Sequence, residues 1–126
     1  MELRNKLIDG QDIMKILIGN EILDGELCGE IELDIALQAE FVDYISSFME
    51  ERGPSIIVDL ASVAYIDSSG LWALFEVHKI AEEKKTRLVF IRPTEDVFRV
   101  LRVTKMLKKL SVFEIEREAV RFLKSE

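Results

Sequence analysis

The chain has 126 residues, a length that suits one compact domain and is too short for two ordinary ones. Hydrophobic residues make up 48% of the sequence and charged residues 33%, a globular balance that excludes a disordered chain. Because 24 Asp and Glu outnumber 17 Lys and Arg, the net charge of -7 disfavours nonspecific binding to nucleic acid. We therefore predict one globular domain with no direct nucleic-acid partner.

Cysteine and histidine are too few for the common disulfide and metal sites. The only cysteine is Cys28 and the only histidine is His78, so neither an intramolecular disulfide nor a zinc site of Cys and His can form. The N-terminal residues lack the apolar segment of a secretory signal, and no apolar stretch approaches the roughly 20 residues of a membrane span. We expect a cytoplasmic protein with no membrane partner, no metal and no cofactor.

Two strands are predicted near the N-terminus, joined as a hairpin. Ile13 to Ile18 form one apolar run, and a second strand lies within Ile22 to Ile31. Gly19-Asn20 and Asp24-Gly25 compete for the turn between them, because both pairs tolerate positive φ and Asp-Gly is the stronger isolated hairpin signal. The residues alone leave this choice open.

A helix is predicted from Asp34 to Arg52. Its apolar residues are spaced by four, four and three positions, which places them on one helical face: Leu37, Phe41, Ile45 and Phe48. Asp34 is available as the N-cap, and Gly53-Pro54 ends the helix.

The middle of the chain predicts a buried strand that leads through a loop into a second helix. Ser55 to Leu60 is short, apolar and rich in β-branched residues, which is typical of a central strand buried on both faces. A loop with Tyr65-Ile66 follows, and then comes the tetrapeptide Asp67-Ser68-Ser69-Gly70. From residue 71 to 85, five residues share one helical face: Leu71, Leu74, Phe75, His78 and Ala81.

Strand and helix alternate again toward the C-terminus. Arg87 to Ile91 is a second buried strand, and Thr94 can cap the helix that follows it. Val112 to Glu116 alternates like an edge strand, and Glu118 to Lys124 forms a last amphipathic helix. This order predicts an α/β fold with a mixed sheet of about five strands, an antiparallel N-terminal hairpin, a parallel centre and about four helices.

No catalytic site is predicted. Ser68 and Ser69 lack the Gly-x-Ser-x-Gly elbow of a hydrolase, and His78 lies two or more turns beyond them, near the apolar face of the helix. The glycine patterns that cradle nucleotide phosphates are absent. Three apolar residues before the last strand are more typical of a core than of a binding groove: Met106, Leu107 and Leu110. The sequence favours a protein that is not an enzyme.

Asp67-Ser68-Ser69-Gly70 is the segment that points most clearly to a function. Asp and Ser are preferred N-caps, so a capping role alone explains the tetrapeptide. The same position exposes a hydroxyl beside unpaired N–H groups at the positive end of a helix, where an added phosphate is tolerated. The residues support both helix capping and phosphorylation.

The segment from Ile57 to Leu71, which contains this tetrapeptide, resembles the strand, loop and phosphorylation motif of the STAS domains, and among them the bacterial anti-sigma factor antagonists. Gly29-Glu30-Ile31-Glu32 is similar to the family's Gly-Glu-Leu-Asp at the end of its second strand, and Val97 through Phe113 resembles its later helix and last strand. The likeness implies a single STAS domain over residues 1–126 with a core of about 13–123. It also favours Gly19-Asn20 as the first hairpin turn.

The resemblance implies a partner-switching protein. In the family the first serine after Asp, here Ser68, is phosphorylated by an anti-sigma factor that is itself a serine kinase. The unphosphorylated form binds that anti-sigma factor and frees the sigma factor, the phosphorylated form lets go, and a PP2C-type phosphatase restores it. The phosphoserine loop and the partner contact are then expected to involve Asp67, Ser69, Gly70 and Glu32, and Ser69 is also expected to cap the helix.

Two residues depart from the family's pattern. Glu32 stands where Asp is common and is one methylene longer, and Lys105 stands where a glycine is frequent at the end of the third helix. The alternative is a STAS scaffold or ligand-sensing module that is never phosphorylated, since STAS domains also serve in transporters and stress-signalling assemblies.

Overall fold

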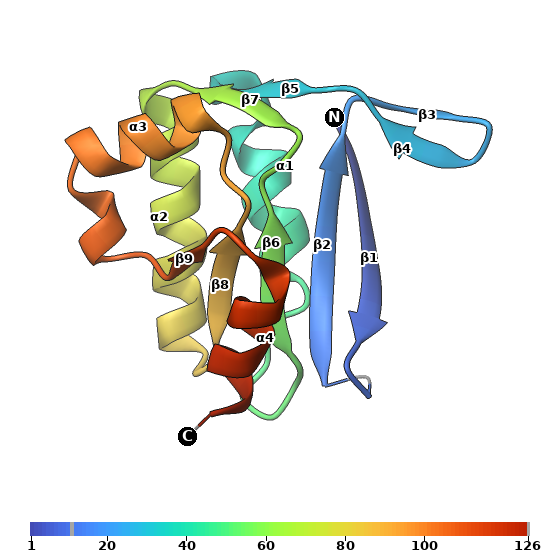
Figure 1. Ribbon diagram of the computed structural model, residues 1–126, viewed down its shortest axis with the longest axis vertical. Helices are drawn as coiled ribbons and strands as arrows, with labels where there is room; N and C mark the ends of the chain where they lie inside the picture. Colours follow the sequence, from blue (N-terminus) through green and yellow to red (C-terminus); the bar gives the residue numbers. More distant parts are fainter. Residues whose placement is uncertain (11, 126) are drawn as a thin grey trace.

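Five strands form one sheet at the centre of the molecule in a computed structural model that describes residues 1–10 and 12–125 (Figure 1). The strand order is β1-β2-β6-β8-β9, with β1 at Glu2–Ile8, β2 at Ile13–Gly19, β6 at Ser55–Asp59, β8 at Leu88–Ile91 and β9 at Val112–Phe113. β1 and β2 pair antiparallel, and the other neighbouring strands pair in parallel. This mixed sheet confirms the predicted α/β fold class.

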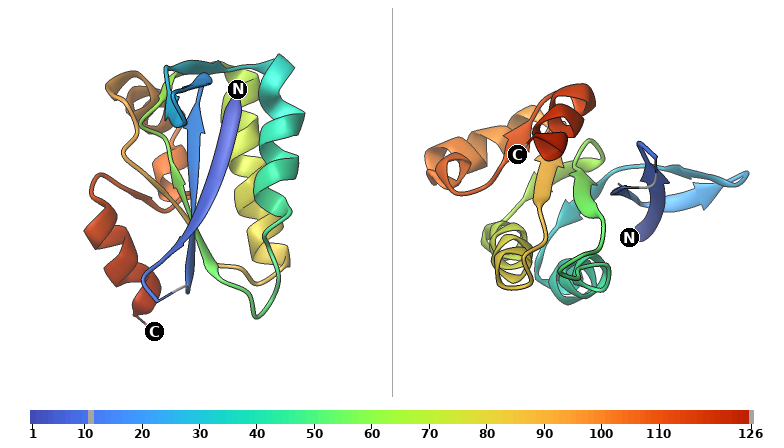
Figure 2. Two further views of the ribbon diagram at one scale, coloured as in Figure 1. Left: turned by 90° about the vertical axis from the view of Figure 1, so that its right-hand side faces the viewer. Right: turned by 90° about the horizontal axis from the view of Figure 1, so that it is seen from below.

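Helices cover both faces of the sheet (Figure 2). α1 (Ile35–Ser46) and α2 (Ser68–Glu83) pack side by side on one face, and α4 (Glu116–Lys124) lies on the other. α3 (Glu95–Val103) follows β8, and the short 3-10 helix η1 (Met106–Lys108) connects it toward β9. The four α-helices found in the described part of the chain match the predicted number.

β6 divides the core in two because its side chains alternate between the faces of the sheet. Ile56 and Val58 belong to the larger core with α1 and α2, whereas Ile57 belongs to the smaller core with α4. All three side chains are fully buried. A strand with helices on both sides has no polar face, which explains its continuous apolar run and confirms the prediction of a central strand.

The antiparallel partner of β2 differs from the predicted one. β1 pairs with β2 along its whole length, from Glu2 opposite Gly19 to Ile8 opposite Ile13. The sequence prediction instead pairs β2 with a strand inside residues 22–31. It misses β1 because most side chains of this edge strand are exposed and polar, so the apolar alternation of a half-buried strand is lacking.

The segment predicted as one strand within Ile22 to Ile31 holds a hairpin and the start of a third strand. β3 (Glu21–Leu23) and β4 (Glu26–Cys28) form the hairpin, and its turn is Asp24-Gly25, with φ of 51° and 80°. Two positive φ values suit the type I′ turn that Asp-Gly favours. The preference for Gly19-Asn20 as the hairpin turn is therefore wrong, because this pair only leads from β2 into β3.

β5 (Ile31–Leu33) pairs in parallel with β7 (Val63–Ile66) as a separate two-stranded sheet, seen at the top of Figure 1. Tyr65-Ile66 therefore belongs to a strand and not to the predicted loop. Glu32 and Tyr65 are exposed, whereas their neighbours along the strands are mostly buried. Such alternation over three or four residues is too short to distinguish a strand from a loop in the sequence.

Two other boundaries differ from the predicted ones. Asp34 caps α1 as predicted, because its carboxylate accepts a hydrogen bond from Ala36 N at 3.0 Å. The helix nevertheless ends at Ser46, so the predicted helix up to Arg52 is too long. At the other end of the chain, α4 begins at Glu116, which shortens the predicted edge strand to the two residues of β9.

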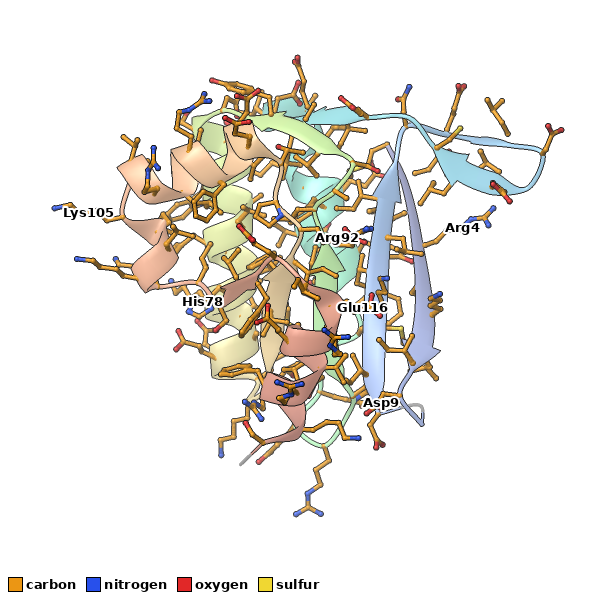
Figure 3. The ribbon with its side chains drawn as sticks, viewed as in Figure 1. Arg4, Asp9, His78, Arg92, Lys105 and Glu116 are labelled. Atoms are coloured by element: carbon orange, nitrogen blue, oxygen red, sulfur yellow. The ribbon has the colours of Figure 1, made fainter. Side chains whose placement is uncertain are left out.

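The chain leaves α3 through a residue in the left-handed conformation. Thr94 caps its start as predicted, with its hydroxyl oxygen accepting a hydrogen bond from Val97 N at 3.3 Å. After the helix ends, Lys105 adopts φ 63° and ψ 18°, and its side chain extends from the edge of the molecule (Figure 3). Glycine adopts this conformation without steric cost, which explains why a glycine is frequent at this position in the resembling family.

Replacing Lys105 with glycine is expected to raise the free energy of unfolding by about 0.5–1 kcal/mol. The change removes left-handed strain of roughly 1–2 kcal/mol, partly offset by the larger backbone entropy of glycine in the unfolded chain. Urea denaturation followed by circular dichroism measures the effect. The control Lys79→Gly, on the exposed side of α2, is expected to lower stability by about 1 kcal/mol. A Lys105→Gly variant that is less stable than wild type would contradict this explanation.

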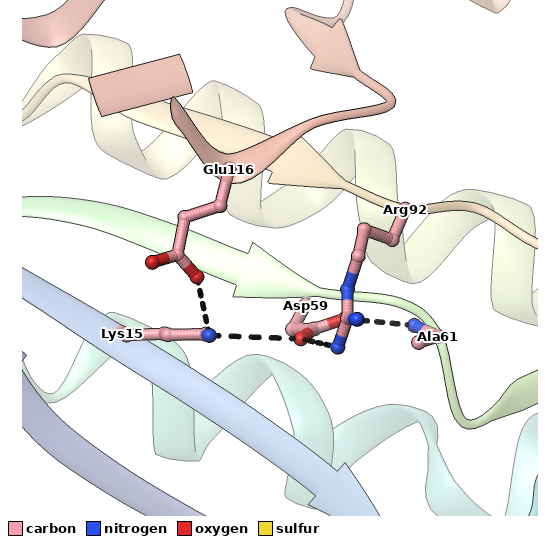
Figure 4. A network of polar contacts seen from close by, with 5 residues as sticks. All are labelled: Lys15, Asp59, Ala61, Arg92 and Glu116. Carbon is pink, nitrogen blue, oxygen red and sulfur yellow. Dashed lines mark hydrogen bonds and ion pairs between the residues drawn. The ribbon is translucent and has the colours of Figure 1, made fainter. Parts of the chain in front are cut away.

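Asp59, buried at the end of β6, anchors a polar network (Figure 4). Its Oδ1 accepts a hydrogen bond from Ala61 N at 2.9 Å, and its Oδ2 accepts one from Nη2 of Arg92 at 2.6 Å. Lys15 Nζ lies 3.9 Å from the same Oδ2 and also pairs with Glu116 of α4. The hydrogen bonds to Asp59 raise the pKa of the Arg92 guanidinium. The network ties β2, β6, the end of β8 and α4 together.

Asp59→Ala is expected to lower the free energy of unfolding by about 2 kcal/mol, because it leaves the Ala61 amide and two cations without their shared acceptor. Asp59→Asn keeps one acceptor oxygen for the Ala61 amide but loses the charge and the oxygen that accepts from Arg92, so its loss of stability should be smaller than that of Asp59→Ala. Urea denaturation of both variants measures the difference. Equal stability of wild type and Asp59→Ala would show that the network contributes nothing.

Candidate functional site

Ser68 lies at the start of α2, directly after the β5–β7 pair. β7 ends at Ile66, and Asp67 is the N-cap, with its carboxylate accepting a hydrogen bond from Gly70 N at 2.9 Å. Ser68 is the first helical residue, and both Asp67 and Ser68 are exposed. The N–H groups of a first helical turn have no carbonyl partner within the helix. A phosphate on Ser68 would therefore stand in water at the positive end of the helix dipole.

Ser69 does not cap the helix, contrary to the prediction. It is the second residue of α2 and is half-buried, while the capping position belongs to Asp67. The backbone of Asp67 is extended, with φ -97° and ψ -168°, as an N-cap requires. Ser69 therefore neighbours Ser68 without performing the expected role.

Gly70 allows α2 to begin against the end of β5. A Cβ atom at this position would lie 2.2 Å from the carbonyl oxygen of Leu33 and 3.0 Å from the Cβ of Ile66. The backbone N of Asp67 lies 3.5 Å from the same Leu33 oxygen, so the strand end and the helix start are in direct contact. Only glycine fits here without a shift of the backbone. Gly70 thereby fixes the position of Ser68 relative to β5.

Glu32 reaches the same edge of the molecule through β5. The parallel register places Glu32 opposite Tyr65 of β7, and both side chains are exposed. β7 leads directly into Asp67 and Ser68. The structure thus gathers Glu32, Asp67 and Ser68 at one end of the molecule, although they come from separate elements. A contact between Glu32 and a partner protein stays a prediction.

A groove of about 260 Å³ opens beside Ser68, on the side of α2 that faces η1. Its lining combines the serine hydroxyl, four apolar side chains and one amine: Ser68, Leu71, Trp72, Phe75, Met106 and Lys109. Trp72 is 52% exposed and stacks at a tilt on Phe75, with ring centroids 5.6 Å apart. An exposed tryptophan beside apolar walls marks a surface that a partner can cover.

The sequence does not reveal this groove, because the predicted apolar face of α2 is only partly the buried one: Leu74 and Ala81 are buried, whereas three of its residues are not. Leu71 and Phe75 are half-buried and line the groove, as does Met106, which the sequence favours as a core residue. The buried face of α2 is formed by Gly70, Ala73, Leu74, Val77 and Ala81. One signal in the sequence could have indicated the groove. Residues 71–75 are all apolar, so the apolar surface of this helix is wider than the single stripe that faces a core.

His78 lies apart from this site. It follows Ser68 by ten positions on the same helix, which separates the two residues by about 15 Å along the helix axis. Its Nε2 lies 3.4 Å from Oε1 of Glu82, one turn further along. A nucleophile and its general base need hydrogen-bond distance, so this geometry does not support a Ser68–His78 pair.

Side chains of the metal-binding type are dispersed over the structure. Among residues 1–10 and 12–125, no three His, Cys, Asp or Glu come together as metal ligands would. None of the helices described for this part of the chain is long and apolar enough to cross a membrane.

The family model described as the STAS domain matches residues 29–119 of this chain. The match contains β5, β7, the Asp67-Ser68-Ser69-Gly70 motif and the whole groove. The chain therefore belongs to the STAS domain family, which confirms the resemblance inferred from the sequence.

Solved structures share the fold over nearly the whole chain. Protein TM1081 from Thermotoga maritima superposes with a TM-score of 0.75 at 21% identity, covering 98% of this chain and 95% of that one. The anti-sigma factor antagonist SpoIIAA, from Bacillus, superposes in its unphosphorylated form with a TM-score of 0.66 at 18% identity, covering 94% and 93%. At these identities the similarity shows the fold alone.

A curated relative belongs to a different class of protein. A probable sulfate transporter, 3.4, from Arabidopsis thaliana is 35% identical over 57 residues. These residues are 45% of this chain and only 9% of the transporter, so the match concerns a small part of that protein.

Proposed function

We propose that this chain is an anti-sigma factor antagonist controlled by phosphorylation of Ser68. In its unphosphorylated form it binds an anti-sigma factor that is also a serine kinase, and this binding releases a sigma factor. Phosphorylation of Ser68 ends the binding, and a PP2C-type phosphatase restores it. The role is regulatory and cytoplasmic, with no catalysis by the chain itself.

The observation that carries this proposal is the exposed hydroxyl of Ser68 at the first position of α2, beside an apolar groove. The fold can accept a phosphate there, because the group would remain in water and meet the positive end of the helix dipole. A protein bound in the groove would have to bury this phosphate away from water or lose its contacts with the groove. The modification therefore acts on the complex and leaves the fold unchanged.

Three of the residues near Ser68 have a distinct role in this proposal. Asp67 caps α2 and so presents Ser68, and Gly70 lets the helix start lie against β5. Ser69 lies beside the modified residue, and Glu32 supplies an exposed carboxylate to the partner from the adjacent strand. The similarity of the fold to SpoIIAA, which is known in unphosphorylated and phosphorylated forms, supports the same mode of control.

A second candidate is a STAS scaffold or ligand-sensing module that is never phosphorylated. The similarity to a segment of a probable sulfate transporter favours this candidate, because that protein is not a sigma-factor regulator by its description. Under this alternative a small ligand, such as a nucleotide or an inorganic anion, raises the melting temperature of the chain and no phosphate is transferred.

Phosphate transfer from purified anti-sigma factor kinases of the source organism tests the proposal. With one of these kinases and ATP, wild type should take up one phosphate, Ser69→Ala should do the same, and Ser68→Ala should take up none. Mass spectrometry of the intact chains measures the uptake. Equal uptake by Ser68→Ala would place the modification elsewhere, and no uptake with any kinase would favour the second candidate.

A further inference from the structure

The groove beside Ser68 is bordered by the most basic segment of an acidic chain. Residues 97–113 contain five bases and no acid, whereas the whole chain has a net charge of -7. The five bases are Arg99, Arg102, Lys105, Lys108 and Lys109. They follow α3 into η1, the same segment that supplies Met106 and Lys109 to the groove. The groove therefore combines apolar walls with one amine, Lys109, that comes from this basic segment.

Most of this positive charge is not neutralised within the described structure. Arg99 pairs with Glu95 and Asp96 of its own helix. None of the ion pairs formed among residues 1–10 and 12–125 includes any of the other four bases. These four side chains are all exposed. They remain available to negative groups outside the chain.

Lys109 is the base placed in the groove itself. Its Nζ lies 5.6 Å from the centroid of the Phe75 ring, in the range of a cation–π contact. The ring holds the amine at the groove without a carboxylate to neutralise it. A carboxylate that enters together with an apolar side chain would meet both kinds of partner at once.

The size of the groove also bears on what can occupy it. Its volume of about 260 Å³ lies below the roughly 300–1,000 Å³ typical of pockets for small molecules. Trp72 and Ser68 are exposed at its surface, so the groove is shallow. Such a site accepts one or two apolar side chains of a larger partner, with the remaining contacts made at the border.

We infer that this groove binds an amphipathic segment of the anti-sigma factor, one that carries apolar side chains flanked by carboxylates. The apolar side chains pack on Trp72 and Phe75, and a carboxylate pairs with Lys109. This inference rests on the proposed function and specifies the chemistry of its partner. It also explains the switch, because a phosphate on Ser68 repels an acidic segment and competes with it for Lys109.

Charge reversal in the groove tests the inference. The binding partner is the kinase that phosphorylates Ser68, and isothermal titration calorimetry measures its affinity for unphosphorylated variants of the full chain. Lys109→Glu is expected to weaken binding at least about tenfold and Lys109→Gln by less. The matched control Lys84→Glu makes the same change at the far end of α2 and should alter affinity by less than about twofold. Circular dichroism verifies that the variants fold.

Three further outcomes would overturn the inference. Lys109→Glu could bind as tightly as wild type while phosphorylation of Ser68 still abolishes binding. The proposed function would then stand, and the inference that an acidic segment binds the groove would be wrong. If sedimentation shows a dimer of this chain that Trp72→Ser dissociates, a second copy covers the groove instead. If no kinase binds wild type, the proposed function fails and this inference fails with it.

Discussion

Phosphorylation of Ser68 is expected to weaken binding of the anti-sigma factor kinase by at least about a thousandfold. A thousandfold loss corresponds to about 4 kcal/mol, and the phosphate adds roughly -1.5 to -2 charges at an exposed position beside the groove. In the free protein this charge is hydrated and lies at a helix N-terminus. In the complex it loses water and faces the partner, so nearly the whole cost falls on binding.

Variants of Ser68 separate the effect of charge from the loss of the hydroxyl. Ser68→Asp should bind weakly because it carries part of the phosphate's charge. Ser68→Ala should bind like the unphosphorylated wild type and stay bound when ATP is added. Ser69→Ala is the matched control, with binding that remains sensitive to ATP. Surface-bound kinase and surface plasmon resonance measure all four proteins. Tight binding of Ser68→Asp and of the phosphorylated chain would contradict the switch.

Gly70→Ala is expected to lower the free energy of unfolding by about 3 kcal/mol. Replacing glycine with alanine inside a helix ordinarily raises stability by roughly 1 kcal/mol, so the expected sign is opposite. The reason is the 2.2 Å approach between the new Cβ and the Leu33 carbonyl oxygen, which belongs to backbone and cannot rotate away. Relief requires α2 to move from β5, with the strain and lost packing of an overfilled core.

The neighbouring position provides the control for Gly70. Ser69→Ala adds no atom and changes one residue of the same helical turn, so its stability should stay within about 0.5 kcal/mol of wild type. Guanidinium chloride denaturation measures both variants. A Gly70→Ala variant as stable as wild type would show that the helix start is not fixed against β5, and the placement of Ser68 would lose its structural basis.

The sequence predicts the layered part of the fold well because burial leaves a strong pattern. β6 and β8 lie between helices; β8 is apolar throughout, and β6 is apolar from Ile56 to Val58. The caps Asp34 and Thr94 act through their own side chains. The pattern is weak where strands are exposed. β1 is largely polar because it lies at the sheet edge, and β5 and β7 are too short to show alternation. These strands depend on tertiary pairing that a local pattern does not contain.

The candidate site also has one part that the sequence reveals and one part that it does not. Asp67, Ser68, Ser69 and Gly70 are contiguous and can be recognised as a motif, and Gly70 proves necessary for a close backbone approach. The groove is built from α2 and from η1, more than thirty residues later in the chain. Lys109 reaches the groove after the chain turns at Lys105, which follows α3. The left-handed conformation of Lys105 cannot be predicted from a lysine in the sequence.

The most direct test of the central claim is the mass of the protein purified from its native host, with fragment mapping of any modification. Samples from growth and from stress conditions should differ in the fraction that carries one phosphate, and that phosphate should map to Ser68. Its absence under all conditions, or its location at another residue, would contradict the proposed switch and favour a scaffold or ligand-sensing role.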